Sequence, residues 1–267
     1  MHREYPVLKK PKDENAKIWR YMGFTKFVSL IDRNALFFAR IDQLDDNFEG
    51  SIPKETYQSL PFVKKYRGTD PKSIQLYMAE RKLKEYDTKM RKESSRRNKA
   101  QRKKVFVNSW HLNEFESAAM WKLYLKSDEG IAIQSTYRRL SDCFASDMKV
   151  HVGMVRYVNY NAQYPFNVAG FPYICKRKSF EHEKELRAIV IKQQSDFIPN
   201  GTSNVKVSGA KIPDGLEVPV SLDRLVEKVY VSPTAEKWFE ELVGSVMGKY
   251  SFNKPFTKSS LADDPIF

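Results

Sequence analysis

Charged residues alternate along one late segment of the chain in a way that suits acid–base chemistry. Glu183, Glu185 and Arg187 lie two residues apart, and a nearly continuous apolar run to Ile191 follows them. Residues at a period of two point to one face of a β-strand. On an exposed edge, these charges would form cross-strand ion pairs. If the strand enters the core with its acidic end on a cleft, burial and like charge would raise the pKa of one glutamate, as in a catalytic carboxylate.

A second group of candidate side chains lies in the middle of the sequence. Ser109 and Trp110 end a predicted strand, and Trp121 and Tyr124 follow on a predicted helix whose N-cap is Ser117. The aromatic side chains could form a flat apolar slot for an aromatic ring, with the serine at its edge. Aromatic residues at helical spacing are also what an ordinary core contains. Both interpretations stay open.

The first part of the chain supplies a cation and an acidic stretch. Arg20 and Tyr21 follow a tryptophan, and residues 42–50 (DQLDDNFEG) contain four carboxylates. Such a stretch can hold a divalent cation through oxygen ligands. More often, its Asp and Asn side chains satisfy the backbone donors of a turn. We therefore favour a turn and predict no metal site.

Most of the excess positive charge is concentrated in one segment. The chain has 46 Lys and Arg against 33 Asp and Glu, a net charge of +13, and residues 81–104 hold 12 basic and 3 acidic residues, or +9. We predict a basic helical insertion at residues 70–104, apolar on one face in its first half. Such a run is either a solvated helix end or a contact that neutralises nucleic-acid phosphates. The candidate contacts are Arg91, Lys92, Arg96, Arg97, Lys99, Arg102, Lys103 and Lys104.

Short strand patterns mixed with helical ones predict an α+β fold. β-branched and aromatic runs indicate strands at residues 36–41, 105–110, 130–133, 151–158, 186–191, 205–207, 216–222 and 229–231. Ser232 and Pro233 are predicted to open a last helix with Trp238, Leu242 and Val246 on one apolar face. We predict one domain over residues 1–267, with a curved, mainly antiparallel sheet, flanking helices and the protruding basic helix.

Composition excludes several classes of protein. Of the 267 residues 41% are hydrophobic, which is enough for a globular core, and the 2 cysteines cannot form a disulfide framework. The sequence has no run of about 18 apolar residues, no apolar signal core after Met1 and no Gly-rich phosphate loop. We therefore predict a cytoplasmic protein without a membrane partner, and leave the oligomeric state open.

Taken in order, these clusters resemble the pattern of a widespread bacterial family, domain of unknown function twenty-nine seventy-one. Its aromatic-Arg-Tyr start and Asp-x-Phe-Glu turn match residues 19–49, and its Met-Trp-x-x-Tyr helix and Gly-Ile-x-Ile strand match residues 120–133. A Val-x-Tyr strand matches residues 155–157, and a Lys-x-x-x-aromatic-x-x-Glu-x-Glu-x-Arg segment matches residues 176–187. The sequence departs from the pattern in the acidic turn, where Asp45 and Asn47 stand in place of the usual Asn and Pro, and in the basic insertion. The resemblance implies a bacterial protein, in the company of phage-defence or toxin systems.

The order of an early Arg, a middle Ser and a late Glu-x-Glu is also similar to the Arg–Ser–Glu order of ADP-ribosyltransferases. The similarity implies that Arg20 holds the pyrophosphate of NAD and that Ser109 positions the nicotinamide ribose. Glu185 would stabilise the positive charge that develops as nicotinamide leaves, and Glu183 would orient the acceptor. Trp110, Trp121 or Tyr124 would stack on the nicotinamide, and Tyr21 is a further implied cofactor-binding residue. The function implied is an NAD-dependent ADP-ribosyltransferase or NAD glycohydrolase acting on or near nucleic acid.

Two alternatives stay open. In the first, the protein binds nucleic acid through the basic segment, with or without Mg²⁺-dependent cleavage by Asp42, Asp46, Glu183 and Glu185. In the second, the protein is a structural module and the charges around Arg187 form an internal ion pair. A requirement for NAD or for Mg²⁺ separates the two kinds of chemistry.

Overall fold

A computed structural model describes residues 8–51, 74–125, 127–161, 171–193 and 212–266. Nine strands form one open, mainly antiparallel sheet, with the order β11–β10–β4–β1–β3–β2–β9, and β8 lies between β3 and β5. Only β10 and β11 pair in parallel within it. The strands are β1 (Lys17–Gly23), β2 (Ala35–Arg40), β3 (Val105–Leu112), β4 (Gly130–Thr136), β5 (Val150–Met154), β8 (Glu185–Ile191), β9 (Gly215–Pro219), β10 (Lys228–Val231) and β11 (Phe256–Lys258).

Helices and a small second sheet complete the described structure. The second sheet pairs β6 (Arg156–Val158) with β7 (Cys175–Arg177) in parallel. The α-helices are α1 (Phe24–Arg33), α3 (Ile74–Arg102), α4 (Ala118–Tyr124), α5 (Tyr137–Asp142), α6 (Leu222–Leu225) and α7 (Lys237–Lys249). The 3-10 turns are η1 (Ile41–Gln43), η3 (Phe171–Ile174), η4 (Lys178–Glu183) and η6 (Ser260–Ala262).

The predicted fold class, α+β with a mainly antiparallel sheet, is confirmed. The predicted strand at residues 151–158 is two strands, β5 and β6, because the backbone N–H of Val155 bonds to Glu185 between them. The strand predicted at residues 216–222 ends at Pro219. The strand predicted at residues 205–207 lies outside the described residues.

The start and the buried face of α7 differ from the prediction. Ser232 and Pro233 precede α7 in a turn closed by a backbone bond from Ala235 to Ser232, and the helix begins at Lys237. Phe239, Val243 and Met247 are buried, whereas Trp238 and Leu242 of the predicted apolar face are 54% and 39% exposed.

Both faces of the central strands are covered. On one face, Trp110 of β3 and Leu186 of β8 belong to the main apolar core with helices α1 and α7. On the other face, Val107 and Ile189 pack with Ile41 and Cys175 in a second cluster. A charged side chain on β3 or β8 is therefore inside the protein.

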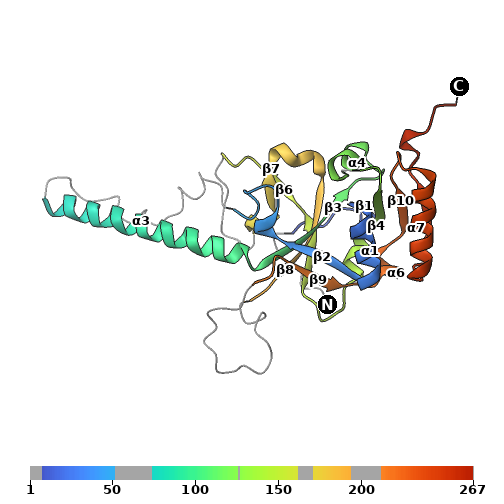
Figure 1. Ribbon diagram of the computed structural model, residues 1–267. Coiled ribbons are helices and arrows are strands. Elements are labelled where there is room, and N and C mark those ends of the chain that lie inside the picture. Colours follow the sequence, from blue (N-terminus) through green and yellow to red (C-terminus); the bar gives the residue numbers. More distant parts are fainter. Residues whose placement is uncertain (1–7, 52–73, 126, 162–170, 194–211, 267) are drawn as a thin grey trace.

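The helix α3 projects away from the sheet (Figure 1). Its 29 residues span about 43 Å at about 1.5 Å per residue. The predicted helix is present from Ile74 to Arg102, and residues 70–73 lie outside the described residues. The side chains of its predicted apolar face, Leu76, Ala79, Leu83, Tyr86 and Met90, also lie outside the described part.

Candidate functional site

The strand that carries the late charges is internal. β8 begins at Glu185 and pairs with β3 on one side and β5 on the other, so the exposed-edge interpretation is wrong. The prediction that Glu183 shares the strand is also wrong, because Glu183 ends η4 and Lys184 has a left-handed backbone conformation with φ of 40°. Glu185 and Arg187 keep the period of two and point to one face.

An ion cluster fills the interior beside β8; we use this name for Glu49, Lys176, Glu183, Glu185 and Arg187. Arg187 is fully buried and donates to both oxygens of Glu185, from Nε at 2.7 Å and from Nη2 at 2.9 Å. It also donates to Glu49, at 3.1 and 3.3 Å. One guanidinium therefore holds two buried carboxylates in fixed positions.

Lys176 is the second cation of the ion cluster. Its Nζ lies 2.6 Å from Glu183, 3.2 Å from Glu185 and 3.5 Å from Glu49. Burial alone would lower the pKa of this lysine, but the surrounding carboxylates raise it, so the ammonium stays charged. Lys176 thus brings Glu183 beside Glu185 although the two glutamates lie on different elements.

A hydrogen-bonded chain joins three of the predicted site residues. Ser109 donates from its hydroxyl to Oε1 of Glu185, and Arg20 donates from Nη1 to the backbone carbonyl of Ser109 at 3.0 Å. β1 and β3 pair only at Ile18 and Trp19. Beyond these residues the guanidinium of Arg20 occupies the place of a β1 partner for Ser109. The early arginine, the middle serine and the late glutamate therefore converge.

The two carboxylates held by Arg187 titrate in opposite directions. Burial would raise the pKa of Glu185, but Arg187, Lys176 and the Ser109 hydroxyl outweigh it and lower the pKa to about 2. Glu49 has fewer donors, so burial prevails and its pKa is raised, with the nearby charge of Glu185 adding to the rise. Glu185 is therefore the more firmly ionised member of the pair.

Tyr124 and Arg20 border the ion cluster. Burial, followed by the charges of Glu183 and Glu185, raises the pKa of the Tyr124 hydroxyl to about 12. Tyr124 is nevertheless 48% exposed, so its ring is accessible from solvent. Burial lowers the pKa of Arg20 to about 10, and the guanidinium remains positive at neutral pH.

Of the other predicted aromatic residues, Trp110 lies beneath the guanidinium of Arg20, 5.9 Å from its ring centroid, and Tyr21 and Trp121 lie in a separate cluster. Trp110 is 2% exposed, and its Nε1 donates to the side chain of Asn108 within the main core. Tyr21 and Trp121 pack edge to face in a separate apolar cluster, where the Tyr21 hydroxyl accepts a bond from the backbone N–H of Ser117. The predicted N-cap at Ser117 is confirmed. These three aromatic residues hold α4 and the core, which leaves Tyr124 at the ion cluster.

The acidic stretch forms the predicted turn. Asp46 accepts from the backbone N–H of Phe48 and pairs with Arg177 at 3.0 Å, and Asp42 pairs with Arg40 at 2.6 Å. The four carboxylates of the Mg²⁺ alternative thus face cations. Among the described residues, no group of three or more His, Cys, Asp or Glu side chains is placed to hold a metal.

The predicted nucleic-acid contacts fall into two groups along α3 and its end. Lys92, Arg96, Lys99 and Lys103 are exposed. The others have protein contacts: Arg97 lies 3.5 Å from Glu93, Arg102 donates to the backbone of Asn47 at 3.3 Å, the carbonyl of Lys104 accepts from Lys192, and Arg91 also interacts.

Four residues of the site were not among the predicted site residues: Glu49, Lys176, Arg187 and Tyr157. The Tyr157 hydroxyl accepts from the backbone N–H of Glu185 at 2.7 Å and so fixes the first residue of β8. All four lie within the motifs that carry the family resemblance. The signal was therefore present in the motif order, but the periodicity of a single strand could not connect these distant segments.

The ion pairs of Glu185 are expected to make the free energy of unfolding fall at acidic pH. Because its pKa is lowered from 4.5 to about 2, its ionised form stabilises the folded state above pH 4.5, and this contribution of about 3 kcal/mol is lost as the pH falls towards 2. Because Glu49 shares Arg187 with Glu185, the comparison is made without it: between pH 6 and pH 3, Glu49→Gln should lose about 2 kcal/mol more unfolding free energy than the double variant Glu49→Gln/Glu185→Gln. Urea unfolding at both pH values measures this difference, and equal losses would contradict the assignment.

No protein-family model matches the chain, and no curated protein matches its sequence. The family resemblance described above stays a prediction. No described helix has an apolar stretch long enough to cross a lipid bilayer.

Proposed function

We propose that the protein cleaves the bond between nicotinamide and ribose in NAD and transfers ADP-ribose to an acceptor or to water. The observation that supports this function is the chain from Arg20 through Ser109 to Glu185. It gathers an anion-binding cation, a hydroxyl and an ionised carboxylate from three strands. Buried charges are costly, and perturbed ionisable groups concentrate at functional sites.

The firmly ionised state of Glu185 suits this reaction. As the bond between ribose C1′ and nicotinamide breaks, its electron pair leaves with nicotinamide and positive charge develops on the ribose. A preorganised negative charge stabilises that transition state, and a pKa of about 2 keeps Glu185 ionised at neutral pH. The acceptor oxygen or nitrogen then bonds to C1′ and releases its proton. We assign to Glu183, which lies beside Lys176, the role of orienting the acceptor.

Arg20 and Tyr124 are assigned to two parts of NAD, the pyrophosphate and the nicotinamide. Arg20 uses one N–H donor on Ser109 among its described contacts, and a guanidinium has five donors suited to phosphate oxygens. The exposed ring of Tyr124 is assigned to stack on the nicotinamide. Among the described contacts, Arg20 therefore keeps N–H donors for the pyrophosphate, and Tyr124 keeps an exposed ring for the nicotinamide.

One observation favours a second candidate, a purely structural ion cluster. Both oxygens of Glu185 are already engaged, Oε1 by Ser109 and Arg187, and Oε2 by Arg187 and Lys176. A carboxylate with four donors is well suited to hold β3, β7 and β8 together. NAD cleavage separates this candidate from the first.

We assign this activity to the cytoplasm of a bacterium, in a phage-defence or toxin system, on the strength of the family resemblance. Both cysteines, Cys143 and Cys175, are buried free thiols. Unpaired thiols are typical of a reducing compartment.

The Arg20→Gln variant tests the proposed function. Wild-type protein with NAD should release nicotinamide, both with and without EDTA. Loss of the charged contact to the pyrophosphate should raise the KM for NAD about 10- to 100-fold, as expected for a hydrogen bond to a charged group. Nicotinamide release at increasing NAD concentration measures KM and kcat.

Arg33→Gln is the matched control, because it removes an exposed guanidinium whose ion pair with Glu217 lies away from the site. Its KM should equal that of the wild type. Absence of nicotinamide release by the wild type, with and without nucleic acid, would reject the proposal and favour the structural candidate. Release that requires Mg²⁺ would also contradict it.

A further inference from the structure

Five exposed cations follow one face of the second half of α3. Lys89, Lys92, Arg96 and Lys99 lie on the helix, and Lys103 follows one residue after its end. They are three, four, three and four residues apart, and this spacing places side chains on the same helix face. We call these five residues the basic stripe. Lys103 lies 14 positions after Lys89, so the stripe spans about 21 Å.

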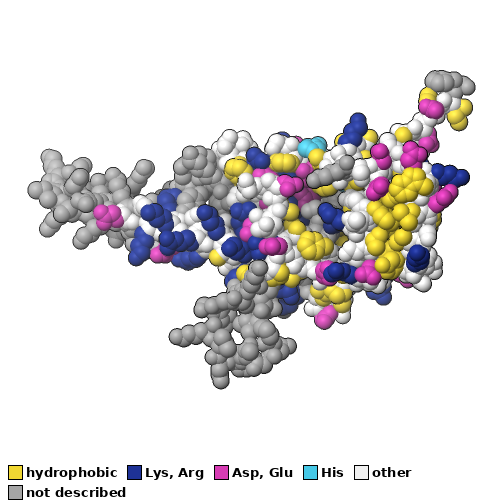
Figure 2. Space-filling view, in the orientation of Figure 1, with side chains coloured by type: hydrophobic (Ala, Val, Ile, Leu, Met, Phe, Trp, Pro, Cys, Tyr) yellow, Lys and Arg dark blue, Asp and Glu magenta, His cyan; other side chains and the backbone are white. Residues whose placement is uncertain are grey.

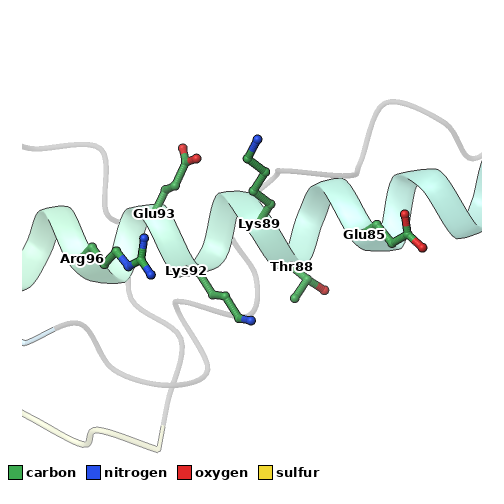
Figure 3. A pocket seen from close by; sticks show the side chains of 6 residues that line it. All are labelled: Glu85, Thr88, Lys89, Lys92, Glu93 and Arg96. Atoms are coloured by element: carbon green, nitrogen blue, oxygen red, sulfur yellow. The ribbon is translucent and has the colours of Figure 1, made fainter.

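The basic stripe is not neutralised by the described part of the protein. None of the five side chains forms an ion pair with a described residue, and the nearby Glu93 pairs with Arg97, which lies off the stripe. Figure 3 shows Lys89, Lys92 and Arg96 succeeding one another along the helix, beside Glu93. In Figure 2, dark blue side chains gather on α3. A row of like charges one turn apart destabilises an isolated helix. No ion pair with a described residue offsets this repulsion within the stripe.

The hollow beside these residues does not suggest a small-molecule site. Its described lining comes from α3 alone: Glu85, Thr88, Lys89, Lys92, Glu93 and Arg96. A ligand-binding cleft normally buries most of its ligand between several elements. A long, straight, one-sided row of cations fits an extended polyanion better than a compact ligand.

We propose that the basic stripe binds the phosphate backbone of double-stranded nucleic acid. Each strand of a duplex presents one phosphate per about 3.4 Å of helix axis, so about 21 Å of duplex offers about six phosphates on one strand. Five cations over the same length match this charge density. The contacts are to phosphates, so the interface recognises the backbone and not a base sequence.

The composition of the helix distinguishes a duplex from other polyanions. Residues 91–104 (RKESSRRNKAQRKK) contain no aromatic side chain, which argues against single-stranded nucleic acid held by base stacking. The same residues have no apolar face to insert into a membrane interface. Phosphate contacts alone therefore remain for this surface.

The position of the stripe relates it to the ion cluster. Lys103 lies six residues before Ser109 on the same stretch of chain, about 20 Å away along an extended strand. The interface does not rest on the NAD chemistry, and binding can be measured without NAD.

Binding of a fluorescent duplex of about 20 base pairs, as DNA and as RNA, tests the interface through anisotropy at increasing salt. The variant changes Lys89, Lys92, Arg96, Lys99 and Lys103 to Gln, which forms helix about as well as Lys and Arg. The slope of log K against log salt should become shallower by about 4 to 5, and affinity at about 0.1 M salt should fall at least about 100-fold. Far-UV circular dichroism checks that α3 is retained.

The control carries the same change of net charge on the body of the protein. It replaces five exposed lysines outside α3, namely Lys26, Lys149, Lys237, Lys249 and Lys258, by Gln. Its salt slope should stay within about 1 of the wild-type slope. Equal slopes for the two variants would overturn the proposal. Tighter binding to a single strand of the same sequence, or binding to phosphatidylserine vesicles but not to the duplex, would overturn it as well.

Discussion

Replacement of Arg187 by Met is expected to reduce the free energy of unfolding by about 3–5 kcal/mol, the cost of removing one partner from a buried ion pair. Arg187 is fully buried and holds Glu185 and Glu49 through four hydrogen bonds. Without it, Lys176 faces three carboxylates alone. The size of Met is close to that of the aliphatic part of Arg, so the effect reports the lost charge more than a cavity.

The pH dependence of this variant distinguishes lost charge from lost packing. Without Arg187, burial raises the folded-state pKa values of Glu49 and Glu185 above those of the unfolded chain. Stability is then present below the unfolded pKa and lost as the pH rises, so the deficit should shrink as the pH falls from about 7 to about 4. Urea unfolding at several pH values measures it.

Arg138→Met provides the matched control, because Arg138 pairs with Glu14 on the surface at 3.4 Å. Exposed pairs contribute about 0–1 kcal/mol, so this variant should remain near the wild type. A cost below about 1 kcal/mol for Arg187→Met, or a deficit that does not change with pH, would show that the ion cluster is not held by this guanidinium.

Glu185→Gln is expected to reduce the turnover of NAD by about 10²–10³-fold with little change in KM. The amide keeps the volume of the side chain but removes the negative charge opposite the developing positive charge. The loss should therefore appear in kcat, because the interaction is made mainly in the transition state. Initial rates of nicotinamide release measure both constants.

Ser109→Ala tests the same site with a smaller change than Glu185→Gln. It removes one of the four donors to Glu185 but keeps the carboxylate, so turnover should fall by about 10-fold. Loss of that donor also raises the pKa of Glu185, which moves the acid limb of the pH–rate profile upwards. A folded Glu185→Gln protein that turns over NAD within about 3-fold of the wild type would instead assign the ion cluster a structural role.

Local patterns predicted the elements of this fold better than their contacts. The strands β3, β4 and β10 follow from β-branched runs within single segments. The register of α7 was misread because Ser232 and Pro233 satisfy a turn before the helix begins. Signals for a helix start and for a turn use the same residues, and tertiary packing decides between them.

Contacts between distant segments were also the part of the candidate site that local patterns predicted least well. Arg20, Ser109 and Glu185 were grouped through a resemblance, and the structure brings them together. The partners that lower the pKa of Glu185 come from β3, β7 and β8, and Glu49 comes from a turn 136 residues earlier in the chain. A single strand pattern contains no information about which distant charge will face it. It is the pairing of β8 between β3 and β5 that buries all these groups at once.

The junction between α3 and β3 has a mechanical consequence. Only Lys103 and Lys104 separate the two elements, and the carbonyl of Lys104 is tied to the backbone of Lys192 after β8. So short and anchored a joint does not let the helix swivel freely. We therefore expect α3 to move together with β3, the strand that carries Ser109. A force on the outer end of α3 would therefore act on β3, and its turning moment would increase with the distance from β3.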